Sequence, residues 1–276
     1  MALRSCPVAG RSGGARGPSG ERESSRRRRS APGEPGTKQR IIEVTATHLA
    51  RLGPRAVELR SICAELDLSP SLVNYYFRST EDLLWQAALH SYGEHVERQT
   101  RVVSEAVSGR MAVEGWVRQS IEWTRKNPGI AALIDFPMLA LEGEDGADPE
   151  VLTRDLADLS RRNVATLASG IHAMLTGRPV RMLGSAKVAL LIRTNATFAY
   201  WTSMVGFGTL GAAMWVAGRR PHSFLWRAFG FSPDAQIDDV VRDLLTRIDQ
   251  DAGRVDDLSQ DLASDAADDQ FPDSKP

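Results

Sequence analysis

Polar and aromatic side chains in the first third of the sequence have the types and spacing that could contact DNA. Ser71, Asn74 and Tyr75 fall on one side of an expected short helix. In a major groove an amide side chain such as Asn74 can pair with adenine, and a phenol can contact a phosphate or a thymine methyl group. The spacing therefore predicts a helix face that reads DNA.

Two short helices must position this face. Apolar residues recur at helical spacing from Leu59 to Leu66, and the pattern breaks at Asp67-Leu68. Ser69 then precedes Pro70, an N-cap followed by proline at the first helical position, so a second helix is expected to begin there. Periodicity alone leaves an ordinary pair of core helices as the alternative. The inward face of the second helix is expected to carry Val73, Tyr76 and Phe77.

The flanking sequence favours the DNA-binding alternative. A helix is expected over residues 37–52, a break follows at Gly53-Pro54, and Arg78-Ser79-Thr80-Glu81-Asp82-Leu83-Leu84 opens another helix, with Ser79 and Asp82 as a capping pair. Over residues 38 to 90 these features resemble the DNA-binding region of TetR-family transcriptional regulators. The resemblance implies a three-helix, helix-turn-helix domain over residues 37–84. The DNA contacts expected from it are Lys38, Arg60, Ser69, Pro70, Ser71, Leu72, Asn74, Tyr75, Tyr76 and Thr80.

Two residues depart from the family pattern. Glu58 stands where a threonine is usual at the start of the second helix, and Thr80 stands where a lysine is usual before the fourth. Both departures weaken the expectation of phosphate contacts there. For Lys38 and Arg60, a solvated surface charge is the alternative to a DNA contact.

Charge is distributed unevenly along the chain. Residues 1–80 contain 14 Lys and Arg against 7 Asp and Glu, a net charge of +7, so the rest of the chain carries −8 of the total of −1. A basic amino-terminal third suits phosphate contacts and would orient the molecule on a duplex. The two cysteines, Cys6 and Cys63, are not expected to form a disulfide, which favours a cytoplasmic protein.

Both ends of the chain have compositions typical of disorder. Residues 1–36 form an arm of net charge +5 with seven glycines, four prolines and the run Arg26-Arg27-Arg28-Arg29, whereas residues 251–276 form an acidic tail of net charge −6. The arginine run is expected to contact phosphates or a minor groove, and a merely solvated extension is the alternative. The acidic tail is expected to keep the protein soluble.

Residues 85–250 are expected to be helical. Asn127-Pro128, Asp148-Pro149 and Ser232-Pro233 each place a capping side chain before a proline, and Pro137 is expected to kink a helix. About nine helices are predicted in an all-α fold, with no sheet and no internal repeat. Those after the first three span about residues 80–108, 110–126, 128–142, 149–176, 181–216 and 234–250.

One stretch must be tested as a membrane span. From Thr194 to Gly218 the sequence has no charged residue over 25 positions, which is long enough to cross a bilayer. However, it contains four glycines and several Thr, Ser and Asn side chains. A buried helix, broken near Gly206 and Gly208, is therefore favoured over a membrane span.

Residues typical of catalysis or metal binding do not form a motif in this sequence. It has no glycine-rich phosphate loop, no His-Glu-x-x-His and no paired cysteines, and the five histidines are scattered. Neither a catalytic site nor a cofactor nor a metal is expected. Aromatic, thioether and polar side chains of the second half are instead typical of a small-molecule pocket, with plain core packing as the alternative for each. The candidate effector-binding residues are Trp116, Trp123, Phe136, Met138, His172, Asn195, Phe198 and Trp201.

The resemblance, together with these features, predicts a DNA-binding transcriptional repressor. It implies a homodimer whose helical domain over residues 85–250 binds a small-molecule effector and dimerises through its last two long helices. The ligand-free form is expected to bind palindromic double-stranded operator DNA, and effector binding is expected to move the fourth helix and release it. The alternatives are a regulator of the same fold without an effector and, less favoured, a membrane-associated or enzymatic helical protein.

Overall fold

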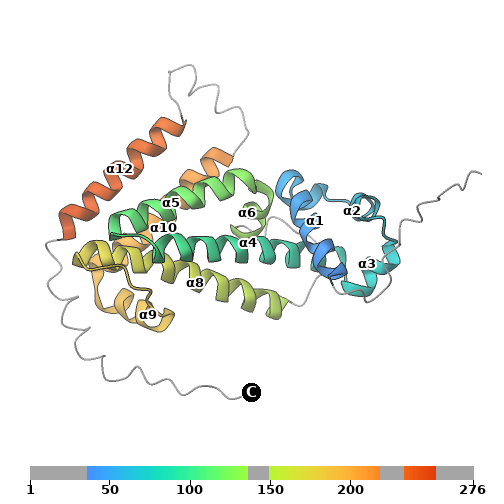
Figure 1. The fold of residues 1–276 in the computed structure, drawn as a ribbon, viewed down its shortest axis with the longest axis horizontal. Coiled ribbons are helices and arrows are strands. Elements are labelled where there is room, and N and C mark those ends of the chain that lie inside the picture. The colour runs from blue at the N-terminus through green and yellow to red at the C-terminus, as the bar shows by residue number, and fades with distance from the viewer. Residues whose placement is uncertain (1–35, 136–148, 218–232, 253–276) are drawn as a thin grey trace, which may run out of the picture.

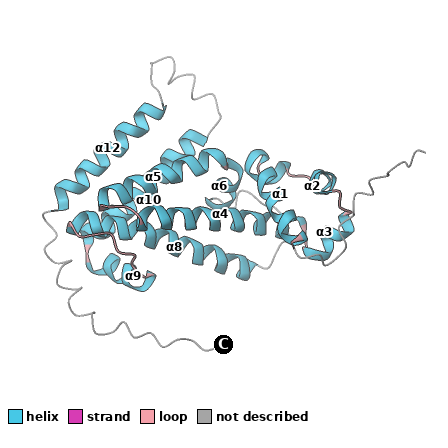
Figure 2. Cartoon of the chain, in the orientation of Figure 1, coloured by secondary structure: helices cyan, strands magenta, loops and turns pink. Residues whose placement is uncertain are grey.

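The computed structural model describes residues 36–135, 149–217 and 233–252, and every regular element in these ranges is a helix (Figures 1 and 2). They contain ten α-helices and one short 3-10 helix, so the predicted all-α class is confirmed. The basic arm, Pro137 and nearly all of the acidic tail lie outside the described residues.

The helix-turn-helix region forms as predicted. α1 (Thr37–Leu52) and the 3-10 helix η1 (Pro54–Ala56) precede α2 (Leu59–Leu66) and α3 (Pro70–Tyr76). Asp67 ends α2 in the left-handed backbone region at φ 55°, where a short polar side chain is tolerated. Ser69 caps α3, because its Oγ accepts a hydrogen bond from the backbone N–H of Leu72 at 3.3 Å. These two residues make the tight turn that sets α3 against α2.

α4 (Thr80–Ser104) links this region to the rest of the molecule (Figure 1). The predicted capping pair is confirmed: Ser79 Oγ accepts from the Asp82 N–H at 3.0 Å, and Asp82 Oδ2 accepts from the Arg78 N–H at 3.0 Å. The helix ends four residues before the predicted position 108. The helix packs on α1, α5, α6 and α8.

The second region is a bundle around α4. It contains α5 (Gly109–Lys126), α6 (Pro128–Asp135), α8 (Pro149–Thr176), α9 (Ser185–Thr194), α10 (Ala196–Ala217) and α12 (Pro233–Asp251). α5 and α8 pack on α4 and on each other, α10 lies against α5 and α8, and α12 contacts α5, α8 and α10 (Figure 1). No helix among the described residues combines the length and apolar character needed to cross a membrane.

The single helix predicted over residues 181–216 is wrong, because the chain forms two helices there. The break lies at Asn195, whose backbone is extended (φ −125°, ψ 107°), and not at Gly206 or Gly208, which lie inside α10. The Asn195 Oδ1 accepts from the Phe198 N–H at 2.8 Å, so the side chain caps α10. An asparagine that bonds the backbone in this way favours a helix start over a helix interior.

Close backbone contact sets the crossing of α5 and α8. A Cβ added to Gly109 of α5 would lie 2.2 Å from the backbone nitrogen of Met174, and one added to Gly170 of α8 would lie 3.2 Å from the Cβ of Ala112. The small residues let the two helices approach closely. The crossing positions Trp116 of α5 beside Asn163 of α8.

We expect Gly109→Ala to destabilise the protein by about 1 to 3 kcal/mol, since the atoms met by the new methyl group are backbone atoms that cannot rotate away. Gly93→Ala on α4 is the matched control. Its Cβ would lie 3.8 Å from Leu159 Cδ2, an ordinary contact, so helix propensity should leave stability equal or raise it by up to about 1 kcal/mol. Urea midpoints at unchanged m-value measure both effects. Equal midpoints for the two variants would contradict the tight crossing.

Candidate functional site

The outward face of α3 carries the polar side chains predicted to read DNA. Ser71 and Asn74 are exposed, and Tyr75 is 71% exposed. On the opposite face Val73 and Phe77 are buried in the core. The structure therefore brings the three predicted side chains together on one short, accessible helix face.

The other residues predicted to contact DNA differ in their exposure to solvent. Leu72 is only 9% exposed, so it belongs to the buried side of α3 and is not part of the exposed face. Tyr76 is half-buried, with its ring centroid 5.1 Å from that of Tyr75. Lys38 is exposed, and its Nζ lies 5.5 Å from the centroid of the Phe77 ring. Exposed positions are also held by Arg60, Ser69, Pro70 and Thr80.

The described part of this domain is only mildly basic. Residues 36–80 contain six Lys and Arg against four Asp and Glu, a net charge of +2, and α3 itself has no charged residue. His48 Nε2 lies 2.7 Å from the Glu65 carboxylate and links α1 to α2. Most of the positive charge of the amino-terminal third therefore belongs to residues 1–35, which the structure does not describe.

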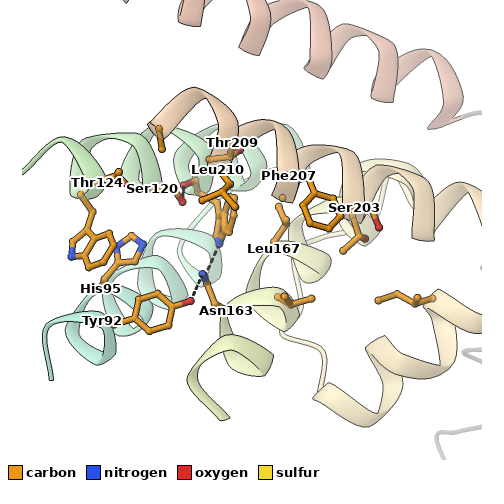
Figure 3. A pocket seen from close by; sticks show the side chains of 17 residues that line it. Tyr92, His95, Ser120, Thr124, Asn163, Leu167, Ser203, Phe207, Thr209 and Leu210 are labelled. Atoms are coloured by element: carbon orange, nitrogen blue, oxygen red, sulfur yellow. Dashed lines mark hydrogen bonds between the residues drawn. The ribbon is translucent and has the colours of Figure 1, made fainter. Parts of the chain in front are cut away.

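A cavity of about 330 Å³ opens among α4, α5, α8 and α10 (Figure 3). Seventeen described residues line it, and none of these is Asp, Glu, Lys or Arg. Its walls are mainly aromatic and aliphatic, with hydroxyl and amide groups between them. This make-up is typical of a small-molecule site near the lower end of the usual size range.

Hydrogen bonds tie three walls of the cavity together. Trp116 Nε1 donates to Asn163 Oδ1 at 3.1 Å, and Asn163 Nδ2 donates to the Tyr92 hydroxyl at 3.2 Å (Figure 3). An indole can only donate, so the amide oxygen of Asn163 must face Trp116 and its nitrogen must face Tyr92. This chain connects α5, α8 and α4 and gives the cavity a defined shape.

An aromatic stack closes the end of the cavity nearest the helix-turn-helix region. The rings of His95 and Trp123 lie nearly parallel, 15° apart, with centroids separated by 4.5 Å (Figure 3). Burial, together with a smaller contribution from the charge of Arg98, lowers the pKa of His95 to about 3. The imidazole is therefore neutral at physiological pH. Neither His95 Nδ1 nor Trp123 Nε1 has a hydrogen-bond partner among the described residues.

Of the effector-binding residues predicted from sequence, Trp116 and Trp123 line this cavity, and Phe136 and Met138 lie outside the described residues. The other four do not line it. His172 packs edge-on against Phe198 with centroids 6.5 Å apart, and burial lowers the pKa of His172. Asn195 caps α10, and Trp201 Nε1 donates to Asp251 Oδ2 at 3.0 Å. In the structure these four residues make packing and capping contacts outside the cavity.

Sequence reasoning missed most of the cavity wall. Tyr92, His95 and Asn163 were not singled out, nor was the face of α10 that carries Thr202, Thr209 and their neighbours. One signal was available. Thr202, Gly206, Thr209 and Ala213 recur at helical spacing within the uncharged stretch, which is the pattern of a single helix face.

Comparison with known proteins gives no close relative. No family model and no curated protein matches the sequence. Among solved structures, the chain is similar to the transcriptional regulator FadR from Bacillus subtilis in complex with stearoyl-CoA (TM-score 0.48, 12% identity), over 77% of this chain and 98% of that one. It is also similar to the fatty acid degradation regulator FadR from Bacillus halodurans (TM-score 0.40, 14% identity), over 66% of this chain and 96% of that one. Both TM-scores are below 0.5, so no ligand or operator is inferred from the likeness.

The lowered pKa of His95 predicts a specific acid sensitivity. Below pH 6.5 the unfolded chain binds a proton that the folded chain excludes until about pH 3, so the free energy of unfolding falls as the pH drops through this window. The loss due to His95 should reach about 2 to 3 kcal/mol at pH 4.5. His95→Phe keeps a ring against Trp123 and should lack this loss, whereas His172 titrates in both proteins.

Urea unfolding of the wild type and the His95→Phe variant between pH 7 and pH 4.5 measures the difference. His90→Phe on the same helix is the matched control and should retain the wild-type acid dependence, because His95 is still present. Parallel plots of unfolding free energy against pH for wild type and His95→Phe would show that His95 carries no such shift.

Proposed function

We propose that this protein is a homodimeric transcriptional repressor of the TetR type, which binds palindromic operator DNA through α3 and releases it when a small molecule occupies the cavity. One observation carries the proposal. A single hydrophobic cluster contains Val73 and Phe77 beside the exposed face of α3 and also Tyr92 and Trp123 in the cavity wall. A change of packing at the cavity would therefore shift the helices that present the DNA-reading face, because both belong to one close-packed cluster.

α4 supports one route between the two sites. Tyr92 and His95 line the cavity, while Leu83 and Leu84 of the same helix are buried in the helix-turn-helix core. Leu84 and Tyr92 are about 12 Å apart along a continuous helix. A rotation or shift of α4 on effector binding would move α3 and change the spacing of the two recognition helices in a dimer.

α6 supports a second route. Trp123 and Thr124 of α5 line the cavity, and Asn127 Nδ2 donates to the Trp123 carbonyl at 2.9 Å just before α6 begins. Gly129 of α6 then packs directly on the end of α1, where an added Cβ would lie 2.0 Å from the carbonyl oxygen of Leu49. Because the two backbones are in direct contact, a displacement of α6 would also move the end of α1.

The energy required is modest. A coupling of about 1 to 3 kcal/mol between the effector and operator sites weakens operator binding roughly 5- to 150-fold. To supply this coupling, the effector must bind the released conformation more tightly than the operator-binding conformation by the same free energy. A regulator of the same fold without an effector is the second candidate. The cavity among α4, α5, α8 and α10 favours the effector-controlled repressor.

An exposed face of α10 suits the proposed dimer. Tyr200, Met204 and Phe207 are exposed at helical spacing, and Ser203 and Gly208 beside them are small. The helix carries no charged residue, so two copies can pack against each other without like-charge repulsion. A two-fold dimer through this face would pair with a palindromic operator.

The experiment that tests the function is selection of bound duplexes from a random DNA pool, using the full chain at fixed salt concentration. An enriched palindrome is the expected result. Failure to enrich any sequence would refute a sequence-specific regulator, and enrichment of a single asymmetric site would refute the two-fold arrangement.

On the selected site, Asn74→Ala should weaken binding by about 1 to 3 kcal/mol, because an amide that pairs with a base is lost from an exposed position. Thr47→Ala is the matched control: Thr47 is exposed on α1, and its hydroxyl bonds only the Glu43 carbonyl of its own helix, at 3.1 Å. Fluorescence anisotropy titration at constant salt measures both. Unchanged affinity of Asn74→Ala would mean that Asn74 does not read a base.

Met204→Arg should convert the dimer to a monomer, because it places a charge in the proposed apolar interface. Met111→Arg on α5 is the matched control, since Met204 is 45% and Met111 54% exposed on their helices. Sedimentation velocity over a range of protein concentrations measures the mass. A Met204→Arg protein that sediments as the wild-type dimer would exclude this face of α10 from the interface.

A further inference from the structure

The chemistry of the cavity wall restricts what the cavity can bind. We infer that the cavity takes an uncharged, largely apolar molecule built of a few rings, and that ionised compounds of the same size are rejected. The inference deepens the proposed function, since it takes this cavity as the effector site.

Charge is the first restriction. An ionised carboxylate or ammonium in the cavity would lose its water and meet none of the opposite charges that offset such a loss, because no charged side chain is among the described residues of the lining. The neutral state of His95 removes the one imidazole that could act as a cation at physiological pH. Arg98, which influences His95, is exposed on α4 and does not line the cavity.

The hydrogen bonds already made inside the wall are the second restriction. Asn163 is occupied by Trp116 and Tyr92, and Ser120 Oγ donates to the Trp116 carbonyl at 2.9 Å while accepting from the amide of Gln99. A ligand with many polar groups would have to break these bonds. Each polar ligand group left without a partner would weaken binding, because its desolvation is not offset.

A small set of neutral polar atoms remains for the ligand. Thr202 and Thr209 lie seven residues apart on the cavity face of α10, 5% and 4% exposed, and neither hydroxyl has a hydrogen-bond partner among the described residues. The stack adds His95 Nδ1 and Trp123 Nε1, which are likewise unpaired in that part of the chain. These groups match one or two hydroxyl, carbonyl or N–H groups on an otherwise apolar molecule.

The entrance is apolar as well. Val164 and Ile192 line the cavity and are also exposed, so a ligand passes aliphatic side chains on its way in. Aromatic rings of Trp116 and Trp123 form deeper walls, where a flat ring system can pack in offset or edge-on contact.

Two fluorescent probes that share one skeleton test the inference. N-phenyl-1-naphthylamine is neutral, whereas 8-anilinonaphthalene-1-sulfonate carries a sulfonate on the same ring framework. Binding is followed by the rise in dye emission on titration with the full-length protein, at fixed pH and salt. The neutral dye is expected to bind at least about tenfold more tightly, because the sulfonate finds no cation in the cavity.

Two glycines supply a cavity variant and a control. Gly206 of α10 lines the cavity, and a Cβ there meets only Leu167 Cδ2 at 3.8 Å, so Gly206→Leu fills the cavity without a backbone clash. Gly184, exposed just before α9, does not line the cavity and an added Cβ meets nothing within 4 Å, so Gly184→Leu is the control. Gly206→Leu should weaken neutral-dye binding at least about tenfold while Gly184→Leu retains it. Circular dichroism of each variant checks that the helices are intact.

Each outcome of the dye titrations either supports or contradicts the inferred ligand class. The dye preference is judged only on the binding that Gly206→Leu removes, since dyes also adhere to exposed apolar surface. If that component binds the sulfonate as tightly as the neutral dye, the cavity accepts anions and the ligand class is wrong, although an effector site remains. If Gly206→Leu affects neither dye, the cavity binds no such molecule. Neither outcome alters the result of the DNA selection, so a failure of the ligand class is distinguished from a failure of the DNA-binding proposal.

Discussion

The hydrophobic core that α4 shares with the helix-turn-helix helices is the constraint on which the rest of the structure depends. Ile41, Leu49 and Ile62 are fully buried in the same cluster as Val96 and Ile130 of the bundle. A three-helix domain of this size buries little apolar surface by itself. α4 and α6 complete its core, and the same cluster reaches Tyr92 and Trp123 in the cavity wall.

Burial also decides the chemistry of the cavity. Desolvation holds His95 neutral and leaves its Nδ1 without a partner, and the neighbouring Trp123 likewise keeps an unpaired Nε1. Buried groups without a hydrogen-bond partner cost free energy, and a ligand that supplies the missing hydrogen bonds would remove that cost. A neutral wall with a few unpaired groups is therefore suited to selecting by shape and hydrogen bonding, and it excludes ions at the same time.

The face of α3 proposed to read DNA is uncharged as well. α3 presents neutral side chains to solvent, and the described helix-turn-helix residues have a net charge of only +2. Base readout depends on such short-range groups, whereas affinity depends largely on phosphate contacts by cations. Eight of the 14 Lys and Arg of residues 1–80 belong to the amino-terminal arm, so under the proposed function the two contributions would come from different segments.

Local patterns in the sequence were enough to determine the all-α class, the starts of α3 and α4 and the outward face of α3. Ser69-Pro70 and Ser79 act through hydrogen bonds within three or four residues, and helical periodicity assigns Asn74 and Val73 to opposite faces without any tertiary contact. The sequence predicted a break near Gly206 and Gly208, whereas the structure breaks this stretch at Asn195, whose side chain caps α10.

Only the tertiary structure decided which side chains form the cavity. Trp116 and Trp201 are both buried tryptophans within long helices, yet one lines the cavity and the other bonds Asp251. The crossing of α5 and α8, with its close contacts at Gly109 and Gly170, positions Trp116 beside Asn163. Helix periodicity specifies a face of each helix but not which neighbour that face meets, because the neighbour is chosen by packing of the whole bundle.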